Sequence, residues 1–150
     1  MDIRNDAPTS QLVVFLLGSE EYGLPIRSVQ EVIRYQQPRA VASSDSTLLG
    51  VINLRGQIVP VHDVRKDLGM SGDRGEAEKI VLVSAEGAMA GIVVDDVLEV
   101  LNVDVGEFED LPAAGNRIVE GVVKSGERLI ILLDPFAVTG LSDGGDAAAA

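Results

Sequence analysis

The chain has no cysteine and no tryptophan, and aromatic residues make up only 3% of its 150 positions. Without cysteine it cannot form disulfides, thiolate nucleophiles or cysteine-based zinc sites. It has only 12 basic residues against 24 acidic ones, which gives a formal net charge of -12. Nucleic acid and anionic membrane surfaces bind clustered cations, so we expect neither as a partner.

The chain also lacks long hydrophobic runs. Its first residues, Met1 to Asp6, contain no apolar signal-peptide core, and no uncharged run reaches membrane-spanning length. We therefore expect a cytoplasmic protein with no direct membrane insertion.

Motifs for catalysis and nucleotide binding are missing as well. Neither a G-x-x-x-x-G-K-[ST] loop nor a G-x-G-x-x-G turn occurs. His62 stands beside Asp63, but no serine elbow or other framed nucleophile accompanies it, so we interpret it as a structural or solvated residue at a strand end. The acidic residues between Asp95 and Asp110 lack the glycine-punctuated loop of a calcium site, and we expect Asp95 and Asp96 in the first turn of a helix. We expect no catalytic residue, no cofactor and no metal.

The chain is 46% hydrophobic and rich in Val, Ile and Leu, a composition that suits strands. Short apolar runs bounded by turn-forming or charged residues predict an all-β fold; they cover residues 11–17, 20–24, 48–54, 57–62, 79–84, 88–94, 117–123 and 128–133. Single helical turns are predicted after two of these runs, at 65–68 and 135–138.

Two segments have helical spacing instead. Ile26, Val29, Val32 and Ile33 would share one face of a helix, and so would a second set, Val94, Val97, Val100 and Leu101. The spacing predicts one short helix in each half of the chain.

The chain nearly repeats itself at an interval of 68 to 71 residues. Residues 23–33 match residues 91–101, and Gly50 with Asp63 matches Gly121 with Asp134. Such a repeat predicts two related units, near 11–68 and 79–138, joined by a glycine-rich link at about 69–79 and flanked by loose tails at 1–10 and 141–150.

The seam between the two units is a candidate binding groove. Val29 and its repeat equivalent Val97 would face each other there, and an open apolar groove accepts an amphipathic helix from a partner. The alternative is that this apolar stripe is simply core.

Residues 50–61 predict a tight hairpin in which Gly56 takes a positive φ and Arg55 stands at the tip. We interpret Arg55 as a solvated turn residue and expect Asn53 to bond to the turn backbone. Pro60 lacks an amide hydrogen, which places its strand at an edge or on a bulge.

Several motifs together resemble the CheW family of bacterial chemotaxis scaffold proteins over about residues 11–140. The matching segments are Glu21-Tyr22-Gly23, Val29-Gln30-Glu31-Val32-Ile33, Gly50-Val51-Ile52-Asn53-Leu54-Arg55-Gly56, Ile58-Val59-Pro60-Val61, Gly91-Ile92-Val93-Val94-Asp95, Val97-Leu98-Glu99-Val100 and Arg128-Leu129-Ile130-Ile131-Leu132-Leu133-Asp134. The resemblance implies two five-stranded, SH3-like barrels packed around a shared core, and a non-enzymatic adaptor.

The resemblance also implies two partners in receptor arrays at the inner face of the membrane. A receptor-tip helix of a methyl-accepting chemotaxis receptor would lie in the groove at Val13, Ile26, Val29, Val32 and Val97. Glu31 matches a family position that is tied to receptor coupling. The regulatory domain of the histidine kinase CheA would dock near residues 50–61. The signature hairpin residues Asn53, Arg55, Gly56 and Ile58 would take part in coupling.

Two features depart from the family pattern. The loop before the signature block has Val41-Ala42 and Asp45 in place of the usual prolines. The family's usual Asp-Leu-Arg with a later aromatic is here Asp63-Val64-Arg65 with Leu68. Two alternatives remain: a similar adaptor of a motility or other chemosensory pathway, and a small-ligand-binding β-barrel, which would need a concave pocket with convergent polar groups.

Overall fold

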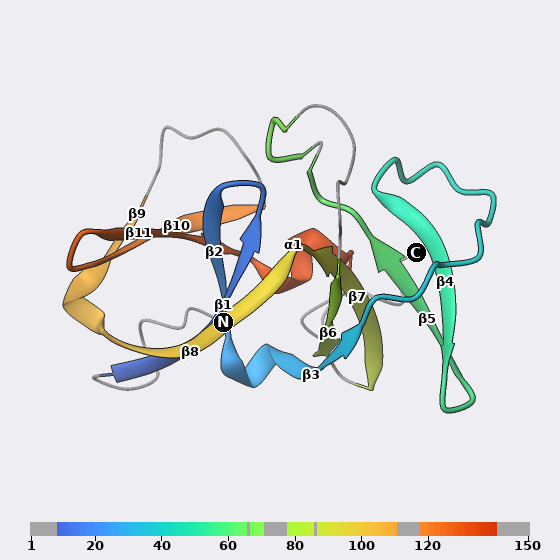
Figure 1. Cartoon of the computed structure of the whole chain (residues 1–150), viewed down its shortest axis with the longest axis horizontal. Coiled ribbons are helices and arrows are strands. Elements are labelled where there is room, and N and C mark those ends of the chain that lie inside the picture. Colours follow the sequence, from blue (N-terminus) through green and yellow to red (C-terminus); the bar gives the residue numbers. More distant parts are fainter. Residues whose placement is uncertain (1–8, 66, 71–77, 86, 111–117, 141–150) are drawn as a thin grey trace.

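The computed structural model describes residues 9–65, 67–70, 78–85, 87–110 and 118–140. Within these residues two sheets form two lobes side by side (Figure 1). The six-stranded sheet, lobe 1, has the order β8 (Asp96–Asp104), β1 (Thr9–Leu17), β2 (Glu20–Pro25), β11 (Arg128–Leu133), β10 (Val119–Ser125), β9 (Phe108–Asp110). The five-stranded sheet, lobe 2, has the order β3 (Val29–Arg34), β6 (Lys79–Ala85), β7 (Ala88–Val94), β5 (Gln57–His62), β4 (Leu48–Leu54).

In the described residues, helical structure is confined to single turns: η2 (Ile26–Ser28), η3 (Val105–Glu107) and α1 (Pro135–Thr139). Of the helices in the described part of the chain, none has the length and apolar character needed to cross a membrane. The predicted all-β fold with two SH3-like lobes is confirmed, and lobe 1 has a sixth, three-residue strand, β9, that the sequence did not predict.

The two repeats exchange strands between the lobes. The first half of the chain places β1 and β2 in lobe 1 and then crosses through η2 to place β3, β4 and β5 in lobe 2. The second half starts with β6 and β7 in lobe 2 and returns to lobe 1 with β8. Each lobe therefore contains strands of both repeats, and β3 and β8 are the strands that follow the crossings.

Three apolar clusters hold the fold together. One fills lobe 1 around Leu12 and Ile130, and another fills lobe 2 around Val59 and Ile80. The third joins the lobes: its buried members are Phe15, Leu17, Tyr22, Leu24, Val64, Val81, Val83, Ile92, Val94, Ile118, Leu133 and Val138. This shared core takes residues from both sheets, so the lobes cannot separate without exposing it to water.

The sequence repeat corresponds to repeated backbone geometry at its glycines. Gly23 lies between antiparallel β1 and parallel β11, and Gly91 lies in the same way between β6 and β5. Gly50 and Gly121 each stand at a register shift in their strand. A Cβ built on Gly50 would lie 2.1 Å from the Arg39 carbonyl oxygen, and one on Gly121 would lie 2.6 Å from that of Glu109. Only glycine allows these close backbone approaches.

The repeated aspartates form equivalent turns. The Asp63 amide donates to the Thr47 carbonyl and the Asp134 amide to that of Ile118. The Asp134 carboxylate then caps α1 by accepting from the amides of Phe136 and Ala137, while that of Asp63 accepts from the Arg65 amide. Both predicted single turns after strands are present, since the Leu68 amide donates to the Val64 carbonyl and α1 covers residues 135–139.

The two predicted short helices are wrong. Val29 to Arg34 forms strand β3, and the second segment lies mostly in strand β8, with only the 3-10 turn η2 near the first. Both faces of these strands carry apolar residues, because one face lines a lobe and the other faces the interlobe region. A bulge between Val29 and Glu31 and another near Leu98 each add one residue to the strand. The apolar residues then no longer alternate strictly, and their spacing resembles that of a helix. Asp95 and Asp96 consequently lie at a strand start and not in a helix.

Two further predictions are modified by the structure. Strand β5 lies between β4 and β7, so it is not an edge strand, yet its pairing with β7 involves only Val61 and His62 and leaves Pro60 outside that ladder. β1 begins at Thr9, inside the predicted tail. The rest of both predicted tails and most of the predicted link lie outside the described residues.

Candidate functional site

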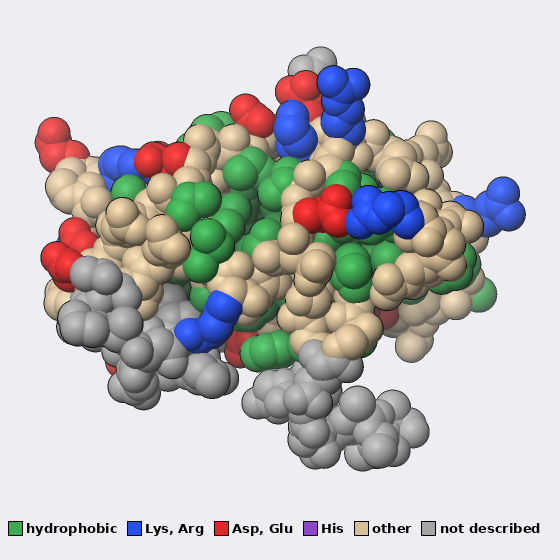
Figure 2. Space-filling view, turned by 90° about the horizontal axis from the view of Figure 1, so that it is seen from below, with side chains coloured by type: hydrophobic (Ala, Val, Ile, Leu, Met, Phe, Trp, Pro, Cys, Tyr) green, Lys and Arg blue, Asp and Glu red, His purple; other side chains and the backbone are tan. Residues whose placement is uncertain are grey.

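An apolar surface lies between the lobes, on the face shown in Figure 2. It is formed by η2 and β3 from one side and by β8 from the other. Its large exposed members are Ile26 and Val32, each 38% exposed, with Leu98 at 42% and Val100 at 49%. Partly buried Val29 and Val97 complete what we call the interlobe surface: Ile26, Val29, Val32, Val97, Leu98 and Val100.

The strand exchange explains why these side chains remain exposed. β3 and β8 each pair with the rest of their lobe through one edge, β3 with β6 and β8 with β1. Their inward residues enter the lobe cores, as Ile33 and Leu101 do. The opposite face of each strand points toward the interlobe region, where the shared core covers only Val29 and Val97 in part. Scattered exposed valines are ordinary, but a continuous apolar patch on a folded chain indicates an interaction surface.

The structure brings together most of the residues predicted for the groove. Val29 and Val97 both pack against the shared core, and Ile26 and Val32 are exposed beside them. Val13 is only 5% exposed; it lies opposite Val100 in the β1–β8 ladder, so the two side chains stand side by side on the same face of the sheet. Sequence analysis did not identify Leu98 and Val100 as surface residues, because it predicted a helix over this segment and not a strand.

The signature hairpin has the predicted tight turn. Arg55 and Gly56 have positive φ values of 51° and 87°, which is the pattern of a type I′ two-residue turn. The Asn53 side-chain oxygen accepts a hydrogen bond from the Gly56 amide at 2.9 Å, so the predicted local role of Asn53 is confirmed. Ile58 is 60% exposed on the returning strand. The hairpin thus presents an apolar side chain on a rigid, locally satisfied turn.

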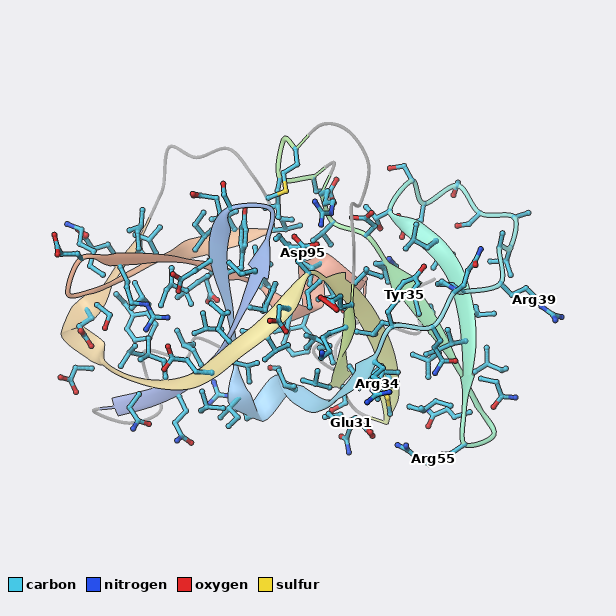
Figure 3. All side chains as sticks on the ribbon, viewed as in Figure 1. Glu31, Arg34, Tyr35, Arg39, Arg55 and Asp95 are labelled. Atoms are coloured by element: carbon cyan, nitrogen blue, oxygen red, sulfur yellow. The ribbon has the colours of Figure 1, made fainter. Side chains whose placement is uncertain are left out.

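The sequence interpretation of Arg55 as a solvated turn residue is incomplete, because the side chain also forms an ion pair. Its Nη2 donates to Glu31 Oε1 at 2.5 Å, which links the hairpin tip to β3 (Figure 3). The side chains are 67% and 34% exposed, so the pair is an exposed one and its contribution to stability is small. Its effect is to hold Glu31 and Arg55 in one place, beside the interlobe surface.

A second charged cluster unites three motif segments on lobe 1. The Arg128 guanidinium lies 2.7 Å from Glu21 Oε1 and 2.7 Å from Glu99 Oε2, so it ties β11 to β2 and β8. Hydrogen bonds to carboxylates, first to Glu21 and to a smaller extent to Glu99, raise the pKa of the Arg128 guanidinium. These residues are far apart in the sequence, and only the strand order brings them together.

Asp95 connects the two lobes. Its Oδ1 accepts from Arg65 Nη2 at 2.5 Å and its Oδ2 accepts from the Gly18 amide at 2.7 Å. The Asp95 amide itself donates to the Leu16 carbonyl. The Arg65 side chain is only 12% exposed and that of Asp95 25%. Asp95 therefore fixes the β1–β2 turn of lobe 1 against the segment that follows β5 of lobe 2.

His62 is structural, as predicted. It is 4% exposed, and its Nδ1 lies 3.0 Å from Thr47 Oγ1, whose hydroxyl donates to Asp45 Oδ1. Burial lowers the pKa of His62, and the Asp45 carboxylate opposes this shift only partly. Among the described side chains, no group of three or more His, Cys, Asp or Glu residues is arranged to hold a metal ion.

Comparison with known proteins identifies the family. The CheW-like domain profile matches residues 11–141. The chain belongs to the CheW-like domain family. A chemotaxis protein CheW of Klebsiella aerogenes is 35% identical over 129 residues, covering 83% of this chain and 78% of the relative. That of Bacillus subtilis is 29% identical over 133 residues, covering 85% of each.

The same family likeness holds for the fold. A crystal structure of the scaffolding protein TtCheW from Thermoanaerobacter tengcongensis superimposes with a TM-score of 0.75 at 34% identity, covering 83% of this chain and 88% of that one. The sequence resemblance to the CheW family is thus confirmed.

Proposed function

We propose that this protein is a non-enzymatic chemotaxis adaptor that couples methyl-accepting receptors to the histidine kinase CheA in arrays at the inner face of the membrane. The observation that carries the proposal is the interlobe surface: in a member of the CheW-like family, an apolar patch remains exposed where strands from both repeats meet. A second surface, on the signature hairpin, supplies the other half of an adaptor.

The interlobe surface suits the receptor tip. An amphipathic helix presents apolar residues at i, i+3, i+4 and i+7, which form one apolar stripe along its length. Val32 and Val100 rise from opposite sides of such a stripe, and Val29 and Val97 form its partly buried centre. Burial of these side chains on binding supplies the attraction, and Glu31, held by Arg55, borders the site.

The signature hairpin suits the kinase regulatory domain. Ile58 projects 60% of its surface into solvent from β5, and β4 beside it is the end strand of the lobe 2 sheet. An exposed apolar side chain next to a strand edge is a common basis for contact between β-barrels. With the receptor on η2, β3 and β8 and the kinase on the β4–β5 hairpin, one molecule holds both, and many moderate contacts add up in an array through effective concentration.

Replacing Val32 with aspartate is expected to weaken binding of a receptor-tip fragment about tenfold or more, because a charge replaces a side chain that complex formation buries. Binding of the kinase regulatory domain should stay unchanged. Val32 is chosen over Val29 because Val29 also packs on the shared core. Isothermal titration calorimetry measures both affinities.

Val41→Asp is the matched control, since Val41 is 46% exposed and lies in the segment before β4, outside the interlobe surface. It should bind the receptor fragment like the wild type. Equal receptor affinity of Val32→Asp and wild type, with both folded by circular dichroism, contradicts the receptor site proposed here.

A further inference from the structure

Charge is distributed unequally between the two lobes. Most acidic residues of the described chain lie in lobe 1, where only Lys124 and Arg128 oppose them: Glu20, Glu21, Asp96, Glu99, Asp104, Glu107, Glu109, Asp110, Glu120 and Glu127. Residues 29–62 of lobe 2 instead carry Arg34, Arg39 and Arg55 against Glu31 and Asp45. A chain of net charge -12 thus keeps an excess of cations on one side of its interlobe surface.

Two of the cations of lobe 2 stand directly opposite each other. Arg34, at the end of β3, is the register partner of Lys79 on β6. Like charges at opposed positions of an antiparallel pair destabilise a sheet. Lys79 has a distant carboxylate neighbour, Asp96, at 3.9 Å, whereas the exposed Arg34 makes no ion pair with any residue that the structure describes. Arg55 and Arg65, by contrast, are held by Glu31 and Asp95.

Arg34 lies at one end of the interlobe surface. Val32 and Arg34 are two residues apart on β3 and so share a face, and the partner of Val32 in β6 is Val81 of the shared core. Asp96 begins β8, whose residues Val97 and Leu98 belong to the same surface. In Figure 3, Arg34 lies near Glu31 and Arg55 on this side of lobe 2. A partner that covers Val32 therefore reaches Arg34 next.

The spacing fits a helix. Two residues along a strand span about 6.7 Å, and four residues along an α-helix rise about 6 Å. A helix that lies along β3 and places an apolar side chain on Val32 would bring its residue four positions away over Arg34 and Lys79. A carboxylate there would relieve the like-charge pair, whereas a lysine or arginine would meet two cations.

We propose that Arg34 and Lys79 form a carboxylate-binding subsite at the end of the interlobe surface, which recognises an Asp or Glu four positions from the apolar residue that a receptor-tip helix places on Val32. This inference rests on the proposed function. It adds that a bound helix needs an Asp or Glu at this position, which fixes the direction in which the helix lies along β3. Apolar burial supplies the attraction, and the subsite sets register and polarity.

The test measures binding of a soluble receptor-tip fragment to wild type, Arg34→Glu and Lys124→Glu at low and high salt. At about 0.05 M salt, Arg34→Glu is expected to weaken binding about fivefold, and the difference should shrink at about 0.5 M because salt screens exposed charges. Lys124→Glu makes the same change in net charge on lobe 1, where Lys124 pairs with Glu109, and should bind like the wild type.

Folding does not confound this comparison, since Arg34→Glu converts the like-charge pair with Lys79 into an attractive one and should leave the melting temperature unchanged or higher. A second arm replaces each Asp and Glu of the tip fragment by lysine in turn. One of these fragments should regain affinity for Arg34→Glu.

The outcomes separate the inference from the function on which it rests. Equal binding of Arg34→Glu and wild type at low salt overturns the subsite and leaves the receptor site in place. A comparable loss in Lys124→Glu also overturns it, because the effect would then come from net charge. Absence of binding by the wild type overturns the proposed function together with the subsite.

Discussion

Gly50→Ala lowers the free energy of unfolding by more than about 3 kcal/mol, which for a domain of this size is a fall of roughly 6–12 °C in melting temperature. The new Cβ would lie 2.1 Å from the Arg39 carbonyl oxygen and 2.5 Å from its carbon. Both atoms belong to backbone that is itself fixed, because Arg39 and Val51 exchange amide hydrogen bonds across an isolated bridge. No side-chain rotation relieves such a clash, so the bulge at the start of β4 must open.

Gly106→Ala is the control for this prediction, since a Cβ at Gly106 would meet nothing within 4 Å. Its unfolding free energy should lie within about 0.5 kcal/mol of the wild-type value. Urea denaturation followed by circular dichroism measures both variants. A Gly50→Ala variant that unfolds at the wild-type urea concentration would show that the backbone at Arg39 moves freely, contrary to the packing described above.

Asp95→Ala is expected to cost about 2–3 kcal/mol. Removal of one partner from a buried ion pair costs about 3–5 kcal/mol, and the partial exposure of Asp95 reduces that figure. The loss has two parts: Arg65 keeps a buried charge without its carboxylate, and the Gly18 amide loses its acceptor. The Nε of Arg65 already lacks a hydrogen-bond partner among the described residues, so the guanidinium depends on Asp95.

A double-mutant cycle separates these parts. Arg65→Met with Asp95→Ala should be more stable than Asp95→Ala alone, because no guanidinium is then left without its nearest carboxylate. The neighbouring carboxylate provides the control: Asp96 is half exposed and 3.9 Å from Lys79, so Asp96→Ala should change stability by less than about 1 kcal/mol. If Asp95→Ala is no more costly than Asp96→Ala, Asp95 does not hold the lobes together.

The sequence predicted the strands well because each apolar run is short and bounded by turn residues. It failed at β3 and β8 for a physical reason. These strands have apolar residues on both faces, since one face lines a lobe and the other contributes to the interlobe surface, and bulges interrupt their alternation. The pattern of Val29 and Val32 therefore matched a helix as well as a strand.

The repeat predicted two related units, and the family resemblance a shared core, but neither predicted the strand exchange. Spacing reports which residues are equivalent, as Gly50 and Gly121 are, and says nothing about which lobe each strand joins. Long-range polar contacts were also beyond prediction: Arg55 with Glu31, and Arg65 with Asp95, become visible only once the strand order is known. The opposition of Arg34 and Lys79 depends in the same way on the β3–β6 register.

The most direct test of the account is co-sedimentation of the full chain with a receptor-tip fragment and with the regulatory domain of CheA, each alone and then together. We predict that the chain binds each partner and that all three sediment as one complex, because the proposed receptor contacts lie on η2, β3 and β8 and the proposed kinase contacts on the β4–β5 hairpin. Binding to neither partner, or displacement of one partner by the other, would contradict the claim that this protein bridges receptor and kinase.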